Sequence, residues 1–153
     1  MTKRHEGLQT LTHDHHHALA QARLLILASD KGDDERRSVA ETFLSFFEAD
    51  TLLHFHEEEE VLFPRLLEHV DDPPDELIRV LLDHVRIHGL VAGLRQALAD
   101  GAPSGEQLKE LGETLKSHVR LEEKELFPLI EKVVPESDLS LLSFAKRERA
   151  QQQ

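Results

Sequence analysis

The stretch that decides the fold reads HFHEEEEVLFP over residues 54–64, and its pattern returns as HVRLEEKELFP over residues 118–128. Each copy has a histidine, a glutamate four residues later and a Leu-Phe-Pro ending. Residues four apart on a helix lie about 40° apart around the axis and roughly 6 Å apart along it, so each imidazole and its carboxylate share one face. We expect the proline to kink or end each helix just past this pair.

The apolar residues around these two copies recur at steps of three and four, which is the period of a helix. Turn-forming clusters at 29–34, 71–75 and 100–105 divide the chain into four amphipathic segments, and 134–137 separates a short last one. No segment has the alternating pattern of a strand. We therefore predict an all-α fold: a single domain over 1–153, with an up-and-down four-helix bundle at about 8–133 and a short helical segment and tail at 136–150.

Histidine or glutamate interrupts each face that should point into the core. The interrupting residues are His15, His54, Glu58, His84, His88, His118 and Glu122. In the first segment His16 is the main competitor of His15, and His88 lies near the edge of its face, where it could meet solvent. Because burying such groups unpaired costs several kcal/mol each, they must satisfy one another or bind something.

Five imidazoles and two carboxylates exceed what one metal ion can use, whereas two ions bridged by the carboxylates can use them all. Imidazole with carboxylate suits iron, zinc or manganese. The chain has no cysteine, which removes thiolate-bound zinc and iron–sulfur ligation. The plain alternative is a set of metal-free histidine–glutamate pairs, and the repeat of the pair with the same Leu-Phe-Pro ending argues against it.

This set of residues resembles the metal ligands of the hemerythrin family, and the Glu-Glu-x-x-Leu-Phe-Pro motif is similar to that of its bacterial HHE branch. The resemblance covers roughly residues 8 to 130. It implies a non-heme di-iron centre with a bridging oxygen, in which Glu58 and Glu122 bridge the two irons. In oxygen-carrying members the last carboxylate follows its histidine by five residues; here the spacing is four, as in bacterial relatives.

The resemblance also implies an unequal division of the histidines between the two irons. His84, His88 and His118 would serve one iron, and His15 and His54 the other. That division leaves one coordination position vacant on the two-histidine side, where a small anion or diatomic molecule would bind. Phe47 and Leu11 are the expected walls of its pocket.

The composition of the chain limits the classes of molecule that it can bind. The net charge of −12, from 30 acidic and 18 basic residues, disfavours nucleic acid and anionic membrane surfaces. No apolar run has the length of a membrane span, the first residues lack the apolar segment of a secretory signal, and the absence of cysteine fits a reducing compartment. We therefore predict a cytoplasmic protein whose partner is a small diatomic ligand such as oxygen or nitric oxide.

Two classes of function fit these residues. The first is a protein that binds or senses a diatomic ligand or a redox signal; the second is an iron-handling or peroxide-reducing enzyme, acting in iron storage, detoxification or repair of iron centres. Ferritin-like enzymes use Glu-x-x-His on two helices, and no glutamate stands three residues before an inward histidine here. A zinc hydrolase would need His-Glu-x-x-His, which is absent. The sequence therefore favours the first class, and no catalytic residue is assigned.

Overall fold

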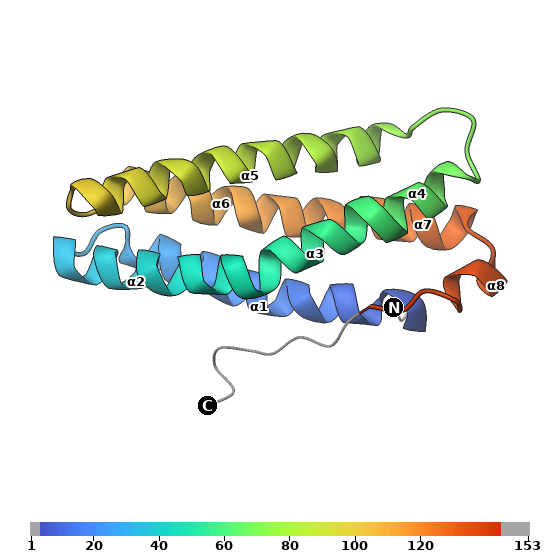
Figure 1. Cartoon of the computed structure of the whole chain (residues 1–153), viewed down its shortest axis with the longest axis horizontal. Helices are drawn as coiled ribbons and strands as arrows, with labels where there is room; N and C mark the ends of the chain where they lie inside the picture. The colour runs from blue at the N-terminus through green and yellow to red at the C-terminus, as the bar shows by residue number, and fades with distance from the viewer. Residues whose placement is uncertain (1–3, 145–153) are drawn as a thin grey trace.

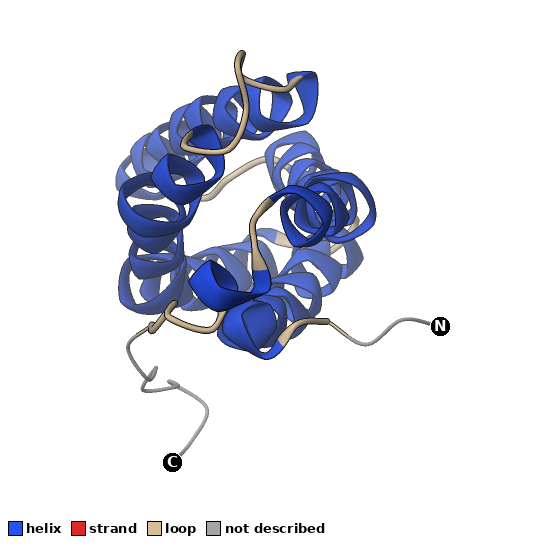
Figure 2. Ribbon diagram, turned by 90° about the vertical axis from the view of Figure 1, so that its right-hand side faces the viewer, coloured by secondary structure: helices blue, strands red, loops and turns tan. Residues whose placement is uncertain are grey.

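The structure is a computed structural model and describes residues 4–144. Long helices lie side by side along one axis (Figure 1), and no strand occurs within residues 4–144. Viewed along that axis, the helices surround a common interior (Figure 2). The prediction of an all-α fold is confirmed.

The helices follow the predicted segments. A 3-10 turn, η1 (Glu6–Leu8), leads into α1 (Gln9–Ala28). The next stretch runs without a break through α2 (Asp33–Phe46), η2 (Phe47–Thr51), α3 (Leu52–Glu57), η3 (Glu58–Leu62) and α4 (Phe63–Leu67). Then come α5 (Asp75–Asp100), the continuous stretch of α6 (Gly105–Leu121), η4 (Glu122–Leu126) and α7 (Phe127–Val133), and the short α8 (Glu136–Leu139).

The two Leu-Phe-Pro endings do not end their helices. Pro64 and Pro128 lie in the first turns of α4 and α7, and the chain stays helical through both. A π-helical turn precedes each proline: the amide of Phe63 donates to the carbonyl of Glu58, and that of Phe127 to the carbonyl of Glu122, five residues back. A proline ring would clash with the carbonyl four residues earlier in an α-helix, and the wider turn makes room for it.

The interior consists of two apolar clusters with a polar layer between them. One cluster joins α1, α2, α5 and α6 and includes Phe43 and Phe47; the other includes Leu11, Leu62 and Phe127 near the opposite end. The buried histidines and glutamates lie on the helices that contribute to both clusters. Apolar packing on either side therefore holds the helices that carry the polar groups.

Helix ends are fixed by local hydrogen bonds at the predicted breaks. Ser104 and Gln107 form a capping box at the start of α6, with the backbone amide of Gln107 donating to Ser104 Oγ at 3.1 Å. Gly101, with φ of 144°, ends α5 in a conformation that favours glycine. These contacts confirm the turn chemistry of the third break.

The C-terminal segment is only partly described. Residues 136–139 of the predicted segment 136–150 form α8, and 145–150 lie outside the described residues. His69 contacts Asp138 at 2.9 Å and His5 contacts Glu136 at 2.8 Å, which fastens α8 to the bundle. Within residues 4–144 no helix is long and apolar enough to cross a membrane.

Gly112 lets the middle of α6 pack closely against α1. A Cβ atom at Gly112 would lie 2.7 Å from the backbone oxygen of Ala22, whereas a Cβ at Gly89 on α5 would meet nothing within 4 Å. We predict that Gly112→Ala lowers the free energy of unfolding by about 1–3 kcal/mol, because the two helices must separate. Gly89→Ala is the matched control and should raise it by roughly 0.5–1 kcal/mol through helix propensity. Urea unfolding of both variants tests this, and stabilisation by Gly112→Ala would contradict it.

Candidate metal centre

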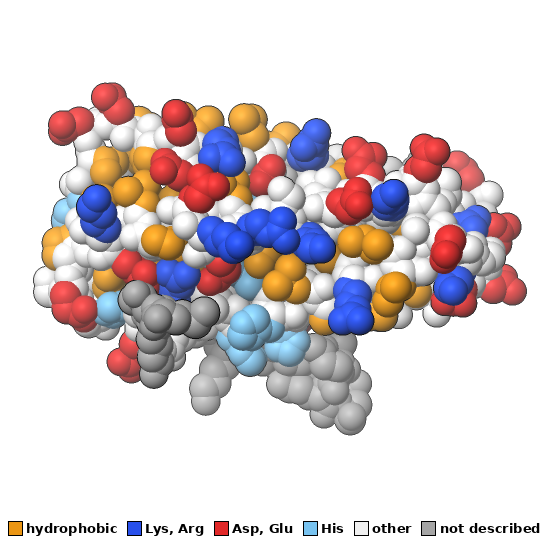
Figure 3. Space-filling model, turned by 180° about the vertical axis from the view of Figure 1, so that it is seen from behind, with side chains coloured by type: hydrophobic (Ala, Val, Ile, Leu, Met, Phe, Trp, Pro, Cys, Tyr) orange, Lys and Arg blue, Asp and Glu red, His pale blue; other side chains and the backbone are white. Residues whose placement is uncertain are grey.

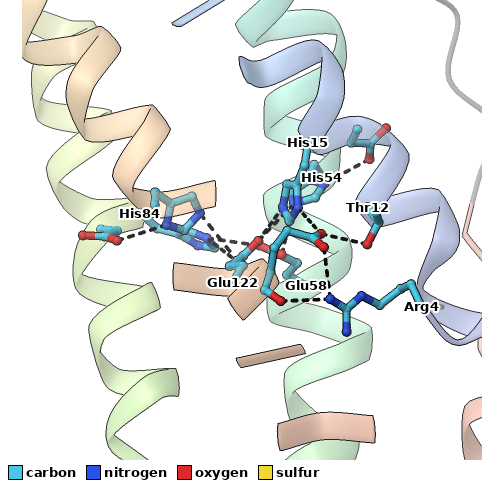
Figure 4. Close-up of polar contacts among 11 residues, drawn as sticks. Arg4, Thr12, His15, His54, Glu58, His84 and Glu122 are labelled. Atoms are coloured by element: carbon cyan, nitrogen blue, oxygen red, sulfur yellow. Dashed lines mark hydrogen bonds and ion pairs between the residues drawn. The ribbon is translucent and has the colours of Figure 1, made fainter. Parts of the chain in front are cut away.

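Four helical stretches each bring one histidine to the middle of the bundle. His15 comes from α1, His54 from α3, His84 from α5 and His118 from α6. Two glutamates join them, and each begins a π-helical turn: Glu58 in η3 and Glu122 in η4. All six side chains are buried, and the two glutamates have no exposed surface. Figure 4 shows how His15, His54, His84 and the two glutamates converge.

The six residues form two groups that share the glutamates. In each group one ligand atom from every member lies within 4.8 Å of the others. The first group is His15, His54, Glu58 and Glu122, and the second is Glu58, His84, His118 and Glu122. The structure thus brings together six of the seven residues singled out in the sequence, in an arrangement that could hold metal ions.

His88 does not join them, so the arrangement of the side chains differs from the expected three-to-two division of histidines. Its side chain is exposed. Its ring packs edge-to-face with Phe47 and Phe55, with the ring centroids 5.8 and 5.9 Å apart. Ile87 is fully buried and takes the inward position at this level of α5. Each group therefore has two histidines. His16 is also exposed, so His15 is the residue of α1 that faces the centre.

A carboxylate lies behind every one of the four histidines, on the ring nitrogen that faces away from the centre. The Nδ1 atoms contact Glu123 from His15 (2.6 Å), Asp14 from His54 (2.9 Å), Glu59 from His84 (2.6 Å) and Asp83 from His118 (3.1 Å). Such a contact holds the proton on Nδ1, so Nε2 can present its lone pair to a metal.

The sequence reasoning missed these four carboxylates. Of the four glutamates at 57–60, only Glu58 was singled out from the sequence, yet Glu59 contacts His84. A signal was present: Asp14 and Asp83 directly precede inward histidines, and Glu123 directly follows an inward glutamate. Since a neighbour in sequence points about 100° away on a helix, it can reach an adjacent helix at the same level.

The contacts repeat with approximate two-fold symmetry. The aspartate on α1 binds the histidine on α3, just as the aspartate on α5 binds the histidine on α6. The glutamate of η4 binds the histidine on α1, just as the glutamate of η3 binds the histidine on α5. Exchanging the first half of the bundle for the second therefore reproduces the site.

Buried atoms at the centre lack hydrogen bonds. They are Nε2 of His54, His84 and His118, both carboxylate oxygens of Glu58, and Oε2 of Glu122. Some are close, as at 3.0 Å between His54 Nε2 and Glu58 Oε2, but the pairs do not have hydrogen-bond geometry. Leaving a buried polar group unsatisfied costs about 1–3 kcal/mol, and a cation between these atoms would satisfy all of them. The donors therefore fit a metal.

Without metal, the site favours charged pairs. Burial alone would lower the pKa of His54, but the negative charge of Glu58 and the hydrogen bond to Asp14 raise it well above its usual value. The pKa values of His15 and His84 are raised in the same way by the surrounding glutamates. Burial opposes ionisation of Glu122, yet the neighbouring histidines hold its pKa well below the usual value.

Glu123 is itself held in place from α1 and the chain before it. Thr12 Oγ1 donates to Glu123 at 2.8 Å, and Arg4 contacts both its carboxylate, at 3.2 Å, and its backbone oxygen (Figure 4). Arg4 also binds Glu131 at 2.7 Å. These contacts fix the carboxylate that orients His15.

A small cavity of about 20 Å³ adjoins three of the histidines. It touches His15, His54 and His118, and Ala18, Phe46, Leu115 and Val119 form much of its apolar lining. Roughly 10–15 Å³ is needed to hold one water molecule, so the cavity has room for a single molecule of that size. The expected walls, Phe47 and Leu11, belong to the packed clusters on either side and do not line it.

A helical bundle that buries two histidine–carboxylate groups with two shared glutamates belongs to the class of helical bundles that could bind metal ions. Residues 6–130 match the family model of the hemerythrin HHE cation binding domain. The chain therefore belongs to the hemerythrin HHE family, as its repeated motif suggests. Neither a curated protein nor a solved structure gives a significant match to the chain.

The raised histidine pKa values predict that the free energy of unfolding changes with pH in opposite directions with and without metal. In metal-free protein the folded state holds protons that the unfolded state releases above pH 6.5, so the free energy of unfolding should fall as pH rises through the raised pKa values of His15, His54 and His84. Below pH 6.5 that contribution is complete. In metal-loaded protein, acid should instead release metal and destabilise, because protons compete for the imidazoles.

Urea unfolding between pH 6 and 9, with chelator or with bound metal, tests this expectation. The two slopes should have opposite signs. Equal slopes would mean that the histidines do not exchange protons for metal.

Proposed function

We propose that this protein holds two metal ions, iron where it is present, and there binds or senses oxygen, nitric oxide or another small redox signal. One observation carries the proposal: buried ligand atoms without hydrogen bonds face one another in two groups that share Glu58 and Glu122. The two glutamates would bridge the ions. His15 and His54 would bind one ion, and His84 and His118 the other, in an up-and-down four-helix bundle of the bacterial HHE type.

The charges around the site favour iron over a permanently divalent metal. Two carboxylates lie in the centre and four lie behind the histidines, while Arg4 beside Glu123 is balanced by Glu131. Six carboxylates beside neutral imidazoles give the site a strongly negative charge, which favours an ion that can become trivalent, as iron can, over one that stays divalent. When bound, iron would supply reversible electron transfer and affinity for diatomic ligands, and the absence of thiolate and the presence of imidazole are compatible with it.

The cavity supports a small, weakly polar ligand. Its lining is mainly apolar and it adjoins His15 and His54 of one group and His118 of the other. Its size admits a diatomic molecule and excludes larger substrates. An apolar wall also limits access of bulk water, which would protect a bound redox-active ligand.

A second candidate function is a peroxide-reducing enzyme, and one observation favours it. Asp50 is buried in η2 and lines the same cavity as the histidines, beside Thr51. Reduction of peroxide consumes protons, and a buried carboxyl group at the cavity is placed to hold one. Turnover of hydrogen peroxide by Asp50→Asn compared with the unaltered protein distinguishes the two functions, since binding alone does not require that proton.

Metal content of variants tests the division of ligands. Glu58→Gln should empty or scramble both sites, because the amide cannot bridge two ions. His15→Ala should leave one ion per chain, and by symmetry so should His84→Ala. His88→Ala is the control and should keep both ions. The number of metal ions per folded chain is measured by mass spectrometry, with circular dichroism as a check of folding. Loss of metal in His88→Ala would restore the three-to-two division of histidines.

Filling the cavity tests the ligand site separately. Ala18 lines the cavity, whereas Ala20 on the same helix is exposed. Ala18→Leu should keep the metal and weaken azide or nitric oxide binding by about 10-fold or more, which corresponds to roughly 1.4 kcal/mol. Ala20→Leu should bind like the unaltered protein. Spectroscopic titration of metal-loaded samples gives the result, and equal affinities in the two variants would exclude this cavity as the ligand site.

A further inference from the structure

The outer side of α1 carries three histidines that the buried centre does not use. His13 and His16 are exposed and His17 is half-buried. Histidine side chains gather on the back face of the molecule (Figure 3). His15 points the other way: residues two apart on a helix lie about 200° apart, so His13 and His17 face away from the centre that His15 joins.

The rings of His13 and His17 are arranged like two ligands of one ion. Their Nε2 atoms are 3.4 Å apart, and the ring centroids are 5.0 Å apart with the planes at 80°. A tetrahedral metal with bonds of 2.0–2.1 Å to imidazole nitrogen separates its ligand atoms by about 3.3–3.4 Å. The two Nε2 atoms also lie within hydrogen-bond distance of each other, and a shared ion would take the place of that contact.

We propose that His13 and His17 form a surface site for a divalent transition-metal ion such as zinc, nickel or copper. Two imidazoles four residues apart on one helix face supply donors that these ions prefer over magnesium or calcium. The ring centroids of His16 and His13 are 6.1 Å apart, but the three histidines do not bring their nitrogen atoms within 4.8 Å of one another. Among residues 4–144 the site therefore has two histidine donors, and water would complete the coordination of the ion.

The net charge of the chain adds to the attraction for a cation. The chain has a net charge of −12, and such a field raises the local concentration of cations. An ion held between His13 and His17 would also cross-link one turn of α1. That turn carries Asp14 and His15, so occupancy of the surface site would stiffen the part of the helix from which the buried centre is built.

The surface site does not depend on what the buried centre binds, and the experiment keeps the two apart. Protein purified without a tag from iron-replete cells, with its buried centre loaded, is titrated with zinc sulfate by calorimetry while iron content and absorption are followed. We expect one additional equivalent of zinc, no release of iron, and retention of the untagged protein on immobilised nickel.

Single variants locate the site. Loss of the hydrogen-bond partner of a metal ligand usually lowers metal affinity about 10–100-fold. Loss of a ligand itself, in His13→Ala or His17→Ala, should weaken zinc binding at least as much and should abolish retention on nickel. His56→Ala is the matched control, because His56 is also exposed and contacts Glu60 four residues on, at 2.8 Å. It should bind zinc like the unaltered protein, and all variants should keep their iron.

Two results would overturn the proposal. One is unchanged zinc affinity in both His13→Ala and His17→Ala. The other is release of iron in proportion to the zinc added, with no additional equivalent, which would place the zinc in the buried centre.

Discussion

The structure depends on two carboxylates that have no contact with water. Glu58 and Glu122 are fully buried, and every other group of the polar layer is arranged around them. Their charge keeps the neighbouring histidines inward, and those histidines in turn hold the aspartates and glutamates behind them. The free-energy cost of burying two charges without partners would exceed the free energy of unfolding of an ordinary domain. The apolar clusters on either side can therefore persist only while this layer is neutralised by protons or by metal.

The backbone is adapted to the same two residues. Each glutamate begins a π-helical turn, and each turn leads to a proline that an α-helix would not accept without distortion. A π-helical turn inserts one residue into a turn of helix and rotates the later part of the helix relative to the earlier part. The glutamate can therefore point to the centre while Phe63 or Phe127, five residues later, still packs into the apolar cluster.

The all-α fold and the inward position of six of the seven candidate residues could be predicted from the sequence, because burial of an amphipathic helix leaves a period that local patterns reveal. The same count puts His88 on the inward face of α5, whereas the structure leaves its side chain exposed, because steps of three and four fit 3.6 residues per turn only approximately. Over the long α5 the inward face moves, and Ile87 takes the position that the simple count gives to its neighbour. The contacts of Asp83 and Glu59 could not be predicted in the same way. They join different helices, so they depend on how the helices are rotated against one another, which no local period contains.

The order of the ligands along the chain bears on how the protein is made. His15 and Glu122, which touch at 2.7 Å in the folded protein, are 107 residues apart in the sequence. A ribosome has therefore synthesised nearly the whole domain before either group of ligands is complete. Nascent chains cannot assemble the centre piece by piece, and an ion that bound there would have to enter a domain that is already almost fully synthesised. The rate at which α1 and α6 open would then set how quickly newly made protein becomes loaded.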